Sequence, residues 1–256
     1  MGNFHYLLNS MQQEYDKYTD EDFEVWKILF ERQIKSLPNK VTEEFLKGIE
    51  RLGFEANRIP NFEEVNKKLI AHTGWRIYVV PGLLPNKEFF ELMEGGNFCA
   101  TTWLRKKSQL DYLEEPDMFH DVFGHVPLLT NQALCNFLKD LSTIALRHIE
   151  SEVAIELIAR LYWYTVEFGL IQEAEGLRIY GAGILSSSGE TDYSLFSEVP
   201  ERVPFDVQNI LDTPYIKDKY QRKYFVINSF EQLYASIPEV EKLVAQAVAE
   251  NKVLAY

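Results

Sequence analysis

The stretch "PDMFHDVFGHVPLL", residues 116–129, places two histidines five residues apart inside a strongly apolar segment. On an ideal α-helix, which turns about 100° per residue, His120 and His125 point about 140° apart. Both imidazoles therefore reach one ion only if the helix ends or distorts between them. Gly124 and Pro127 are residues that break a regular helix at this point. Two interpretations stay open here: the histidines fill a core, or they hold a metal ion.

A metal site would need acidic side chains beside the two histidines, and two candidates follow from the sequence. Pro116 and Asp117 suit a helix start, and Asp117 is placed to accept a hydrogen bond from the second ring nitrogen of His120. In "YWYTVEFGL", residues 162–170, Glu167 stands among aromatic and β-branched residues. A glutamate is rarely buried unless it is paired or bound to a metal, although an exposed or Arg-paired Glu167 is an equally good reading of this segment alone. Two imidazoles and one carboxylate together form the facial triad of non-haem Fe(II) oxygenases.

The hydrophobic pattern of the rest of the chain is mostly helical. Apolar residues at helical spacing predict helices within residues 19–34, 42–53, 61–74, 85–96, 131–148, 151–170 and 238–252. Short extended segments are expected within residues 75–82 and 99–105, at the edge of a pocket over 177–190, and before a helix over 223–234. Thr19, Thr42 and Ser229 are the expected N-caps, and Gly53 is an expected stop. The prediction is a mainly α fold with a few short β-strands (α+β), in a single domain over residues 1–256.

Composition and charge limit the class of protein. The 256 residues are 46% hydrophobic, which is enough for a substantial core. The net charge of −13 argues against nucleic acid or an anionic membrane as the main partner. The N-terminus resembles neither a signal peptide nor, with Tyr6 after Gly2, a myristoylation signal, and no segment reaches the roughly 20 apolar residues of a membrane span. Because Cys99 and Cys135 are too few for a disulfide framework, a cytoplasmic enzyme or binding protein is expected.

Three segments resemble the pterin-dependent aromatic amino acid hydroxylases almost letter for letter: "PDMFHDVFGHVPLL", "LYWYTVEFGL" and "YGAGILSSSGE". The longer stretch "YLEEPDMFHDVFGHVPLL" is most similar to the bacterial phenylalanine 4-monooxygenases of that family. The resemblance runs from about Thr73 to Ile237. It implies a catalytic domain with iron in a deep cleft, which hydroxylates L-phenylalanine to L-tyrosine with Fe(II), a tetrahydropterin such as tetrahydrobiopterin, and O₂. Neither a regulatory domain nor a C-terminal tetramerisation coiled coil is expected, which favours a monomer or a weak dimer.

The resemblance also implies roles for individual residues. It assigns the iron to His120, His125 and Glu167. The positions that match the pterin site are Gly82, Leu83, Leu84, Phe89, Asp121, Ala159 and Tyr162. The positions that match the substrate pocket are Arg105, Leu113, Pro116, Trp163, Phe168, Gly183 and Ser186. In this assignment Phe89 stacks on the pterin, Arg105 pairs with the substrate carboxylate, and Ser186 steadies His120.

Alternatives to this reading differ in kind. Without the resemblance, Phe89 and Trp163 would be expected in the core, and Arg105 in a surface ion pair. A zinc hydrolase also uses two histidines and a glutamate, but the H-E-x-x-H pattern is absent. A non-catalytic binder of aromatic amino acids is the alternative outside enzymes. Tryptophan or tyrosine as substrate needs only changes in the pocket, and the loop "TPYIKDK", residues 213–219, which matches the family's specificity region, indicates no preference.

Overall fold

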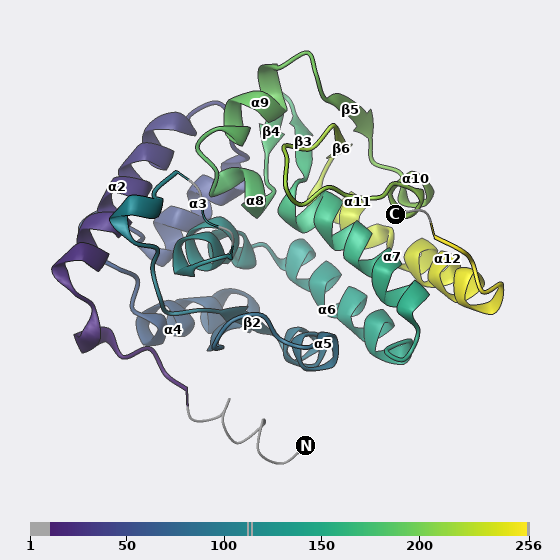
Figure 1. Cartoon of the computed structure of the whole chain (residues 1–256), viewed down its shortest axis with the longest axis horizontal. Helices are drawn as coiled ribbons and strands as arrows, with labels where there is room; N and C mark the ends of the chain where they lie inside the picture. Colours follow the sequence, from purple (N-terminus) through teal and green to yellow (C-terminus); the bar gives the residue numbers. More distant parts are fainter. Residues whose placement is uncertain (1–10, 112, 114, 255–256) are drawn as a thin grey trace.

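The computed structural model describes residues 11–254 except residues 112 and 114 (Figure 1). The sequence signals at Gly2 and Tyr6 therefore lie outside the described residues. The α-helices are α2 (Asp20–Ser36), α3 (Glu43–Leu52), α4 (Phe62–Thr73), α5 (Asn86–Glu94), α6 (Gln132–Arg147), α7 (Glu152–Tyr162), α8 (Ala182–Leu185), α9 (Glu190–Phe196), α10 (Val207–Asp212), α11 (Phe230–Ala235) and α12 (Ile237–Ala249). Among the described residues, every helix is too short or too polar to span a lipid bilayer.

The remaining elements are short. Helical turns of other types are η1 (Tyr15–Lys17), η2 (Lys107–Gln109), η3 (Phe119–His125), η4 (Val126–Thr130) and η5 (Trp163–Glu167). The strands are β1 (Arg76–Val79), β2 (Asn97–Ala100), β3 (Leu170–Glu173), β4 (Gly176–Ile179), β5 (Glu201–Pro204) and β6 (Lys223–Ile227). Helices dominate and the strands are four or five residues long. The predicted mainly α fold with a few short strands is confirmed.

Local hydrogen bonds explain where the N-terminal helices begin and end. The hydroxyl of Thr19 accepts from the Asp22 amide while the Asp22 carboxylate accepts from the Thr19 amide, which forms a capping box for α2. Helix α3 ends at Gly53, whose φ of 73° is a left-handed conformation that glycine adopts without strain. Thr42 is the N-cap residue of α3 as predicted, but its side chain makes no capping hydrogen bond, because the hydroxyl donates instead to Glu173 Oε1 in β3 at 2.6 Å.

The strands form two sheets. Strands β1 and β2 pair in parallel, and the second sheet has the order β4-β3-β6-β5, in which β3 pairs antiparallel with β4 and β6 pairs in parallel with β3 and β5. In Figure 1 this second sheet lies beside α8 and α9, above the long helices α6 and α7. The strand expected within residues 99–105 lies earlier, because after Ala100 the Thr101 amide donates to the Asp121 carboxylate at 2.8 Å.

Aromatic packing positions η3. Phe119 and Phe123 stack on each other at 4.7 Å between ring centroids, and Trp26 of α2 and Phe45 of α3 each contact one of them edge to face at 5.5 Å. A fully buried side chain of this size contributes about 1.5–3 kcal/mol of burial free energy. Gly48 allows α3 to pack this closely, because a Cβ there would lie 2.1 Å from a carbonyl oxygen of η4. The face of η3 that carries Phe119 and Phe123 is thus fixed in the core.

Candidate active site

Two π-helical segments carry the residues predicted to bind a metal. η3 contains His120 and His125, and η5 ends at Glu167. A π-helix forms its hydrogen bonds over five residues, so side chains five apart lie on the same face. This geometry brings the two imidazoles together, which a regular α-helix cannot do. The predicted distortion of the helix is confirmed, although Gly124 and Pro127 alone did not indicate its π form.

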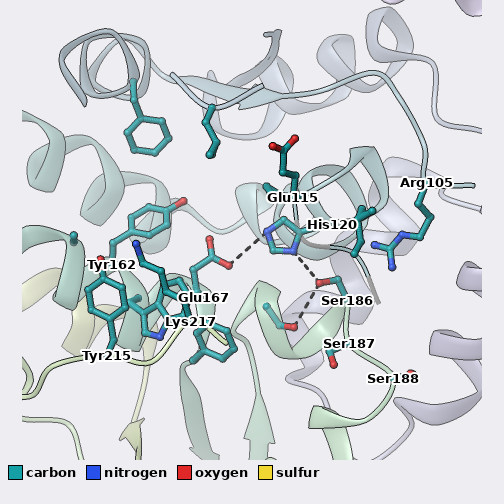
Figure 2. A pocket seen from close by; sticks show the side chains of 18 of the residues that line it. Arg105, Glu115, His120, Tyr162, Glu167, Ser186, Ser187, Ser188, Tyr215 and Lys217 are labelled. Carbon is teal, nitrogen blue, oxygen red and sulfur yellow. Dashed lines mark hydrogen bonds and ion pairs between the residues drawn. The ribbon is translucent and has the colours of Figure 1, made fainter. Parts of the chain in front are cut away.

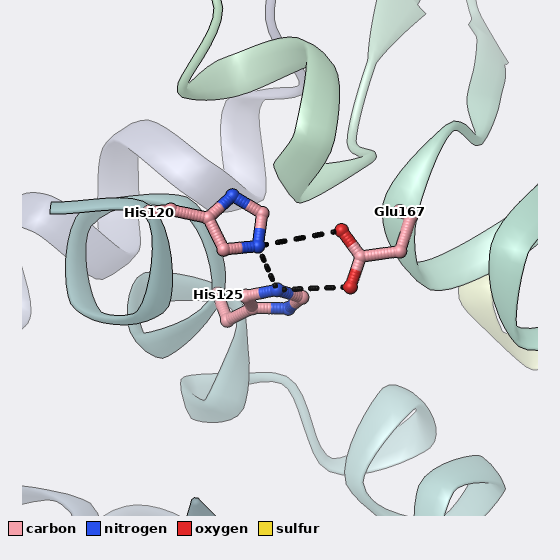
Figure 3. Close-up of side chains that lie close together, drawn as sticks. All are labelled: His120, His125 and Glu167. Carbon is pink, nitrogen blue, oxygen red and sulfur yellow. Dashed lines mark hydrogen bonds and ion pairs between the residues drawn. The ribbon is translucent and has the colours of Figure 1, made fainter. Parts of the chain in front are cut away.

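The three side chains converge on one point (Figure 3). The Nε2 atoms of His120 and His125 are 3.3 Å apart, and Glu167 places its carboxylate oxygens 3.6 Å from His120 Nε2 and 3.2 Å from His125 Nε2. With ligand bonds of about 2.0–2.2 Å, neighbouring donors at right angles around one ion lie about 3 Å apart. The spacing therefore fits three adjacent ligands of one metal ion. Among the described residues, a group of three or more His, Cys, Asp or Glu side chains close enough to hold one ion occurs here.

The electrostatics of this group also suit a divalent cation. Burial raises the pKa of Glu167, but the facing imidazoles of His125 and His120 and a hydrogen bond from His125 lower it by more, so that the pKa lies below its ordinary value. The carboxylate is consequently anionic at neutral pH. Two imidazole nitrogens and one anionic oxygen form a donor set that accepts Fe(II) as well as other first-row divalent metals.

A serine fixes the orientation of one imidazole. The Ser186 hydroxyl lies 2.9 Å from His120 Nδ1 and donates to the Ala182 carbonyl at 2.9 Å. Since its proton is directed to Ala182, the serine oxygen accepts from Nδ1–H of His120. This hydrogen bond leaves the lone pair of Nε2 directed toward the centre. The contact expected between Ser186 and His120 is present.

Asp117 has a different partner from the one predicted. Its fully buried carboxylate accepts from Arg105 Nε at 2.9 Å, from Arg105 Nη2 at 2.8 Å and from the Arg105 amide at 2.9 Å. It also accepts from the backbone amide of His120 at 3.2 Å. The predicted hydrogen bond to the imidazole ring is therefore wrong, because the guanidinium occupies the carboxylate and Ser186 occupies the ring nitrogen. Asp117 holds the backbone of η3 at His120 instead.

The predicted substrate residues line one cavity of about 640 Å³ (Figure 2). All of them do so: Arg105, Leu113, Pro116, Trp163, Phe168, Gly183 and Ser186. Arg105 is 8% exposed, so the alternative of a surface ion pair is wrong, and the guanidinium faces this cavity while it is paired with Asp117. Trp163 is half-buried and contacts Phe168 at 4.7 Å between ring centroids. It forms a wall of the cavity rather than part of a closed core.

The predicted pterin residues surround a second cavity of about 250 Å³ and its border with the first. Gly82, Leu84 and Asp121 line the second cavity, and Ala159 lines the first. Leu83, Phe89 and Tyr162 line both. Asp121 is fixed by hydrogen bonds from the amide and hydroxyl of Thr101 at 2.8 and 2.9 Å. His120 and Glu167 line both cavities, so the two spaces meet at the three converging side chains.

Several residues that line the larger cavity were not singled out from the sequence. Arg32, Glu115, Tyr215 and Lys217 all line the larger cavity. Tyr215 stacks on Trp163 with 4.8 Å between ring centroids and 29° between planes. The only signal for Tyr215 and Lys217 was their place within the loop "TPYIKDK". Arg32 comes from α2, far away in sequence, and no local pattern marks it.

Comparisons with known proteins agree with this arrangement. Residues 8–249 match the family described as biopterin-dependent aromatic amino acid hydroxylase, a longer match than the segment from about Thr73 to Ile237. The phenylalanine-4-hydroxylase of Chromobacterium violaceum is 48% identical over 238 residues, which are 93% of this chain and 80% of that relative.

Solved structures of that bacterium's phenylalanine hydroxylase are similar throughout. One with bound oxidised Fe(III) has a TM-score of 0.91 and 46% identity, covering 96% of this chain and 88% of the other. One with iron(III) and the oxidised cofactor 7,8-dihydrobiopterin has a TM-score of 0.87 and 47% identity, covering 93% and 86% of the two chains. From the extent of these matches, this chain belongs to the biopterin-dependent aromatic amino acid hydroxylase family.

Proposed function

We propose that this chain is a phenylalanine 4-monooxygenase, which converts L-phenylalanine to L-tyrosine with Fe(II), a tetrahydropterin and O₂. The observation that carries the proposal is the convergence of His120, His125 and Glu167 where two cavities meet. Its support from relatives is the family match and the phenylalanine hydroxylases of known structure with bound iron and dihydrobiopterin.

In this proposal His120, His125 and Glu167 form a facial triad for the iron. Bound iron and reduced pterin together supply the electrons that activate O₂, which otherwise reacts slowly with closed-shell molecules. The protein keeps the ligands in place through Ser186, which orients one imidazole, and through Asp117, which holds the backbone amide of His120.

The larger cavity would hold the amino acid. Trp163, Phe168 and Tyr215 offer aromatic faces to its ring. Asp117 binds Nε and Nη2 of Arg105, which leaves Nη1 to pair with the substrate carboxylate. With the carboxylate and the ring both held, the reacting carbon is kept in one orientation beside the metal site.

The smaller cavity would hold the pterin. Phe89 borders both cavities and offers a face for the pterin ring, and Asp121 faces the same space with its carboxylate anchored on Thr101. When both cavities are filled, the ligands themselves exclude water from the metal site.

An assay of the iron-loaded protein tests the proposal. Protein loaded with Fe(II) without oxygen is given reduced pterin, O₂ and each of the three aromatic amino acids, and the products are identified by mass. Tyrosine from phenylalanine is the expected main product. Exclusive hydroxylation of tryptophan or tyrosine would replace the proposed substrate.

Ligand variants test the assignment of the metal site. His120→Ala, His125→Ala and Glu167→Ala are each expected to lose bound iron and hydroxylation together. The matched control is His72→Ala, because His72 is exposed on α4 and lines neither cavity. Near-normal turnover by a ligand variant with quantified metal would contradict the assignment.

We also propose that the whole chain acts as one catalytic domain, as a monomer or weak dimer in the cytoplasm. One apolar core runs through the described residues, from Val25 in α2 to Ala247 in α12. Cys99 and Cys135 are both free thiols, as expected in a reducing compartment. A zinc hydrolase would use the same three ligands, but membership of the hydroxylase family opposes that alternative.

A further inference from the structure

One buried glutamine connects two walls of the larger cavity. Gln221 is 2% exposed and does not line the cavity itself. Its Oε1 accepts from the indole nitrogen of Trp163 at 3.1 Å. Its Nε2 donates to the carbonyl of Ile216 at 2.7 Å and to the carbonyl of Lys219 at 3.4 Å. A single amide therefore binds an aromatic wall residue and a neighbouring loop at the same time.

That loop, residues 213–220, which we call the pocket loop, contributes to the cavity directly. Tyr215 and Lys217 line the cavity, on the side away from Arg105 (Figure 2). Tyr215 stacks on Trp163, and the carbonyl of Pro214 accepts from the Tyr164 hydroxyl at 2.8 Å. A change in the course of the pocket loop therefore moves Tyr215 and alters the space beside Trp163.

The amide of Gln221 has one allowed orientation. An indole N–H only donates, and backbone carbonyls only accept, so a flipped amide would mismatch both sets of partners. The backbone at Gln221 is also held, because the backbone N–H of Gln221 donates to Glu190 Oε1 at 3.3 Å. The hydroxyl of Tyr224 donates to the same oxygen at 2.6 Å. The Gln221 side chain is thus held in one orientation, with its oxygen accepting from Trp163 and its nitrogen donating to the pocket loop.

We propose that Gln221 is a positioning residue that sets which aromatic ring the enzyme accepts. It fixes the orientation of Trp163 and the course of the pocket loop together, and so fixes how Trp163 and Tyr215 stack and the shape of the cavity wall that they form. Loss of these hydrogen bonds lets Trp163 and the pocket loop move, which weakens the binding of phenylalanine and admits the larger ring of tryptophan. The inference rests on the proposed function, whose substrate selection it explains.

The test compares Gln221→Leu with the matched control Gln208→Leu. Leucine has a similar volume to glutamine and has no hydrogen-bonding group in its side chain. Gln208 is an exposed residue of α10, and its side-chain amide donates to the Asp212 carboxylate. KM and kcat are measured with phenylalanine and with tryptophan, and the Kd of each amino acid is measured by calorimetry.

Gln221→Leu is expected to raise KM and Kd for phenylalanine about 10-fold, because the hydrogen bonds that hold Trp163 and the pocket loop are both lost. The change in kcat is expected to be smaller, since the iron ligands do not contact Gln221, and the preference for phenylalanine over tryptophan is expected to fall. In a Trp163→Phe background, which lacks the indole donor, the same substitution should have a smaller effect. Gln208→Leu should match the wild type in every constant.

Unchanged preference and unchanged phenylalanine Kd in folded Gln221→Leu would overturn the inference, as would an equal change in Gln208→Leu. If Gln221→Leu does not fold, Gln221→Asn takes its place, because it keeps both amide groups but is one carbon shorter and cannot bond to Trp163 and to the pocket loop at once. A smaller shift in the same direction is then expected, and no shift overturns the inference. The Kd values for phenylalanine and tryptophan test the role of Gln221 without any need for turnover. A wild type that binds phenylalanine but makes no tyrosine therefore counts against the proposed function and not against this inference.

Discussion

Replacing Asp117 by alanine is expected to destabilise the fold strongly. The carboxylate has no exposed surface and accepts four hydrogen bonds, three from Arg105 at 2.8–2.9 Å and one from the His120 amide at 3.2 Å. Without it, the guanidinium of Arg105 stays 8% exposed with no compensating charge in these contacts. Removing one partner of a buried ion pair costs about 3–5 kcal/mol of unfolding free energy.

That cost is large for one side chain. In a chain of this size each kcal/mol lowers the melting temperature by about 2–4 °C, so Asp117→Ala should melt about 6–20 °C below the wild type. The matched control is Asp111→Ala, because Asp111 also pairs with an arginine, Arg32 at 2.7 Å, but has an 87% exposed side chain. Exposed pairs contribute about 0–1 kcal/mol, so the control should change the melting temperature little.

Urea unfolding with a metal chelator present measures the difference, since bound metal would add its own stability to the folded state. The double variant Arg105→Met/Asp117→Ala should recover part of the loss, because it removes the buried charge together with its partner. The reasoning is refuted if Asp117→Ala unfolds within about 1 kcal/mol of Asp111→Ala, where an exposed pair would be expected.

Three further predictions concern single groups. Ser186→Ala should weaken iron binding by about 10- to 100-fold, because His120 loses the partner that orients its ring; competition with a chelator measures this, and unchanged affinity would contradict it. Tyr180→Phe should stabilise the fold by about 1 kcal/mol, since the buried Tyr180 hydroxyl has no hydrogen-bond partner; a lower melting temperature would count against this. Burial raises the pKa of Glu190 above its ordinary value of 4.5, so the folded chain keeps a proton that the unfolded chain releases. The unfolding free energy should therefore fall as the pH rises above about 4.5, and Glu190→Gln should lack this part of the fall in unfolding curves measured across that range.

Local signals predicted much of the helical framework. The Thr19 capping box and the left-handed glycine at Gly53 involve neighbours within a few residues, so their chemistry can be read directly from the chain. Strand β3 was missed because its first residue, Leu170, continues the apolar run of the helix expected over residues 151–170. Strand β5 was missed because it is four residues long and pairs with β6, which follows about 20 residues later in the chain. A strand that depends on a distant partner leaves little trace in its own sequence.

The geometry agrees with the predicted grouping of residues where the prediction rested on residue type, and agrees less where the outcome depends on packing. His120, His125 and Glu167 were identified because two imidazoles and a carboxylate in apolar surroundings need an explanation. The partner of Asp117 was wrong, because Arg105 comes from a preceding loop and its direction depends on the tertiary structure. Gln221 was missed for the same reason, since its neighbours in sequence give no sign of Trp163.

The central claim is that one iron ion is bound by His120, His125 and Glu167. Crystals of the iron-loaded protein, measured on both sides of the iron absorption edge, locate the metal directly. The account predicts one anomalous peak within about 2.2 Å of both Nε2 atoms and of the Glu167 carboxylate. A peak bound by other residues, or none at these three in crystals shown to contain iron, would contradict it.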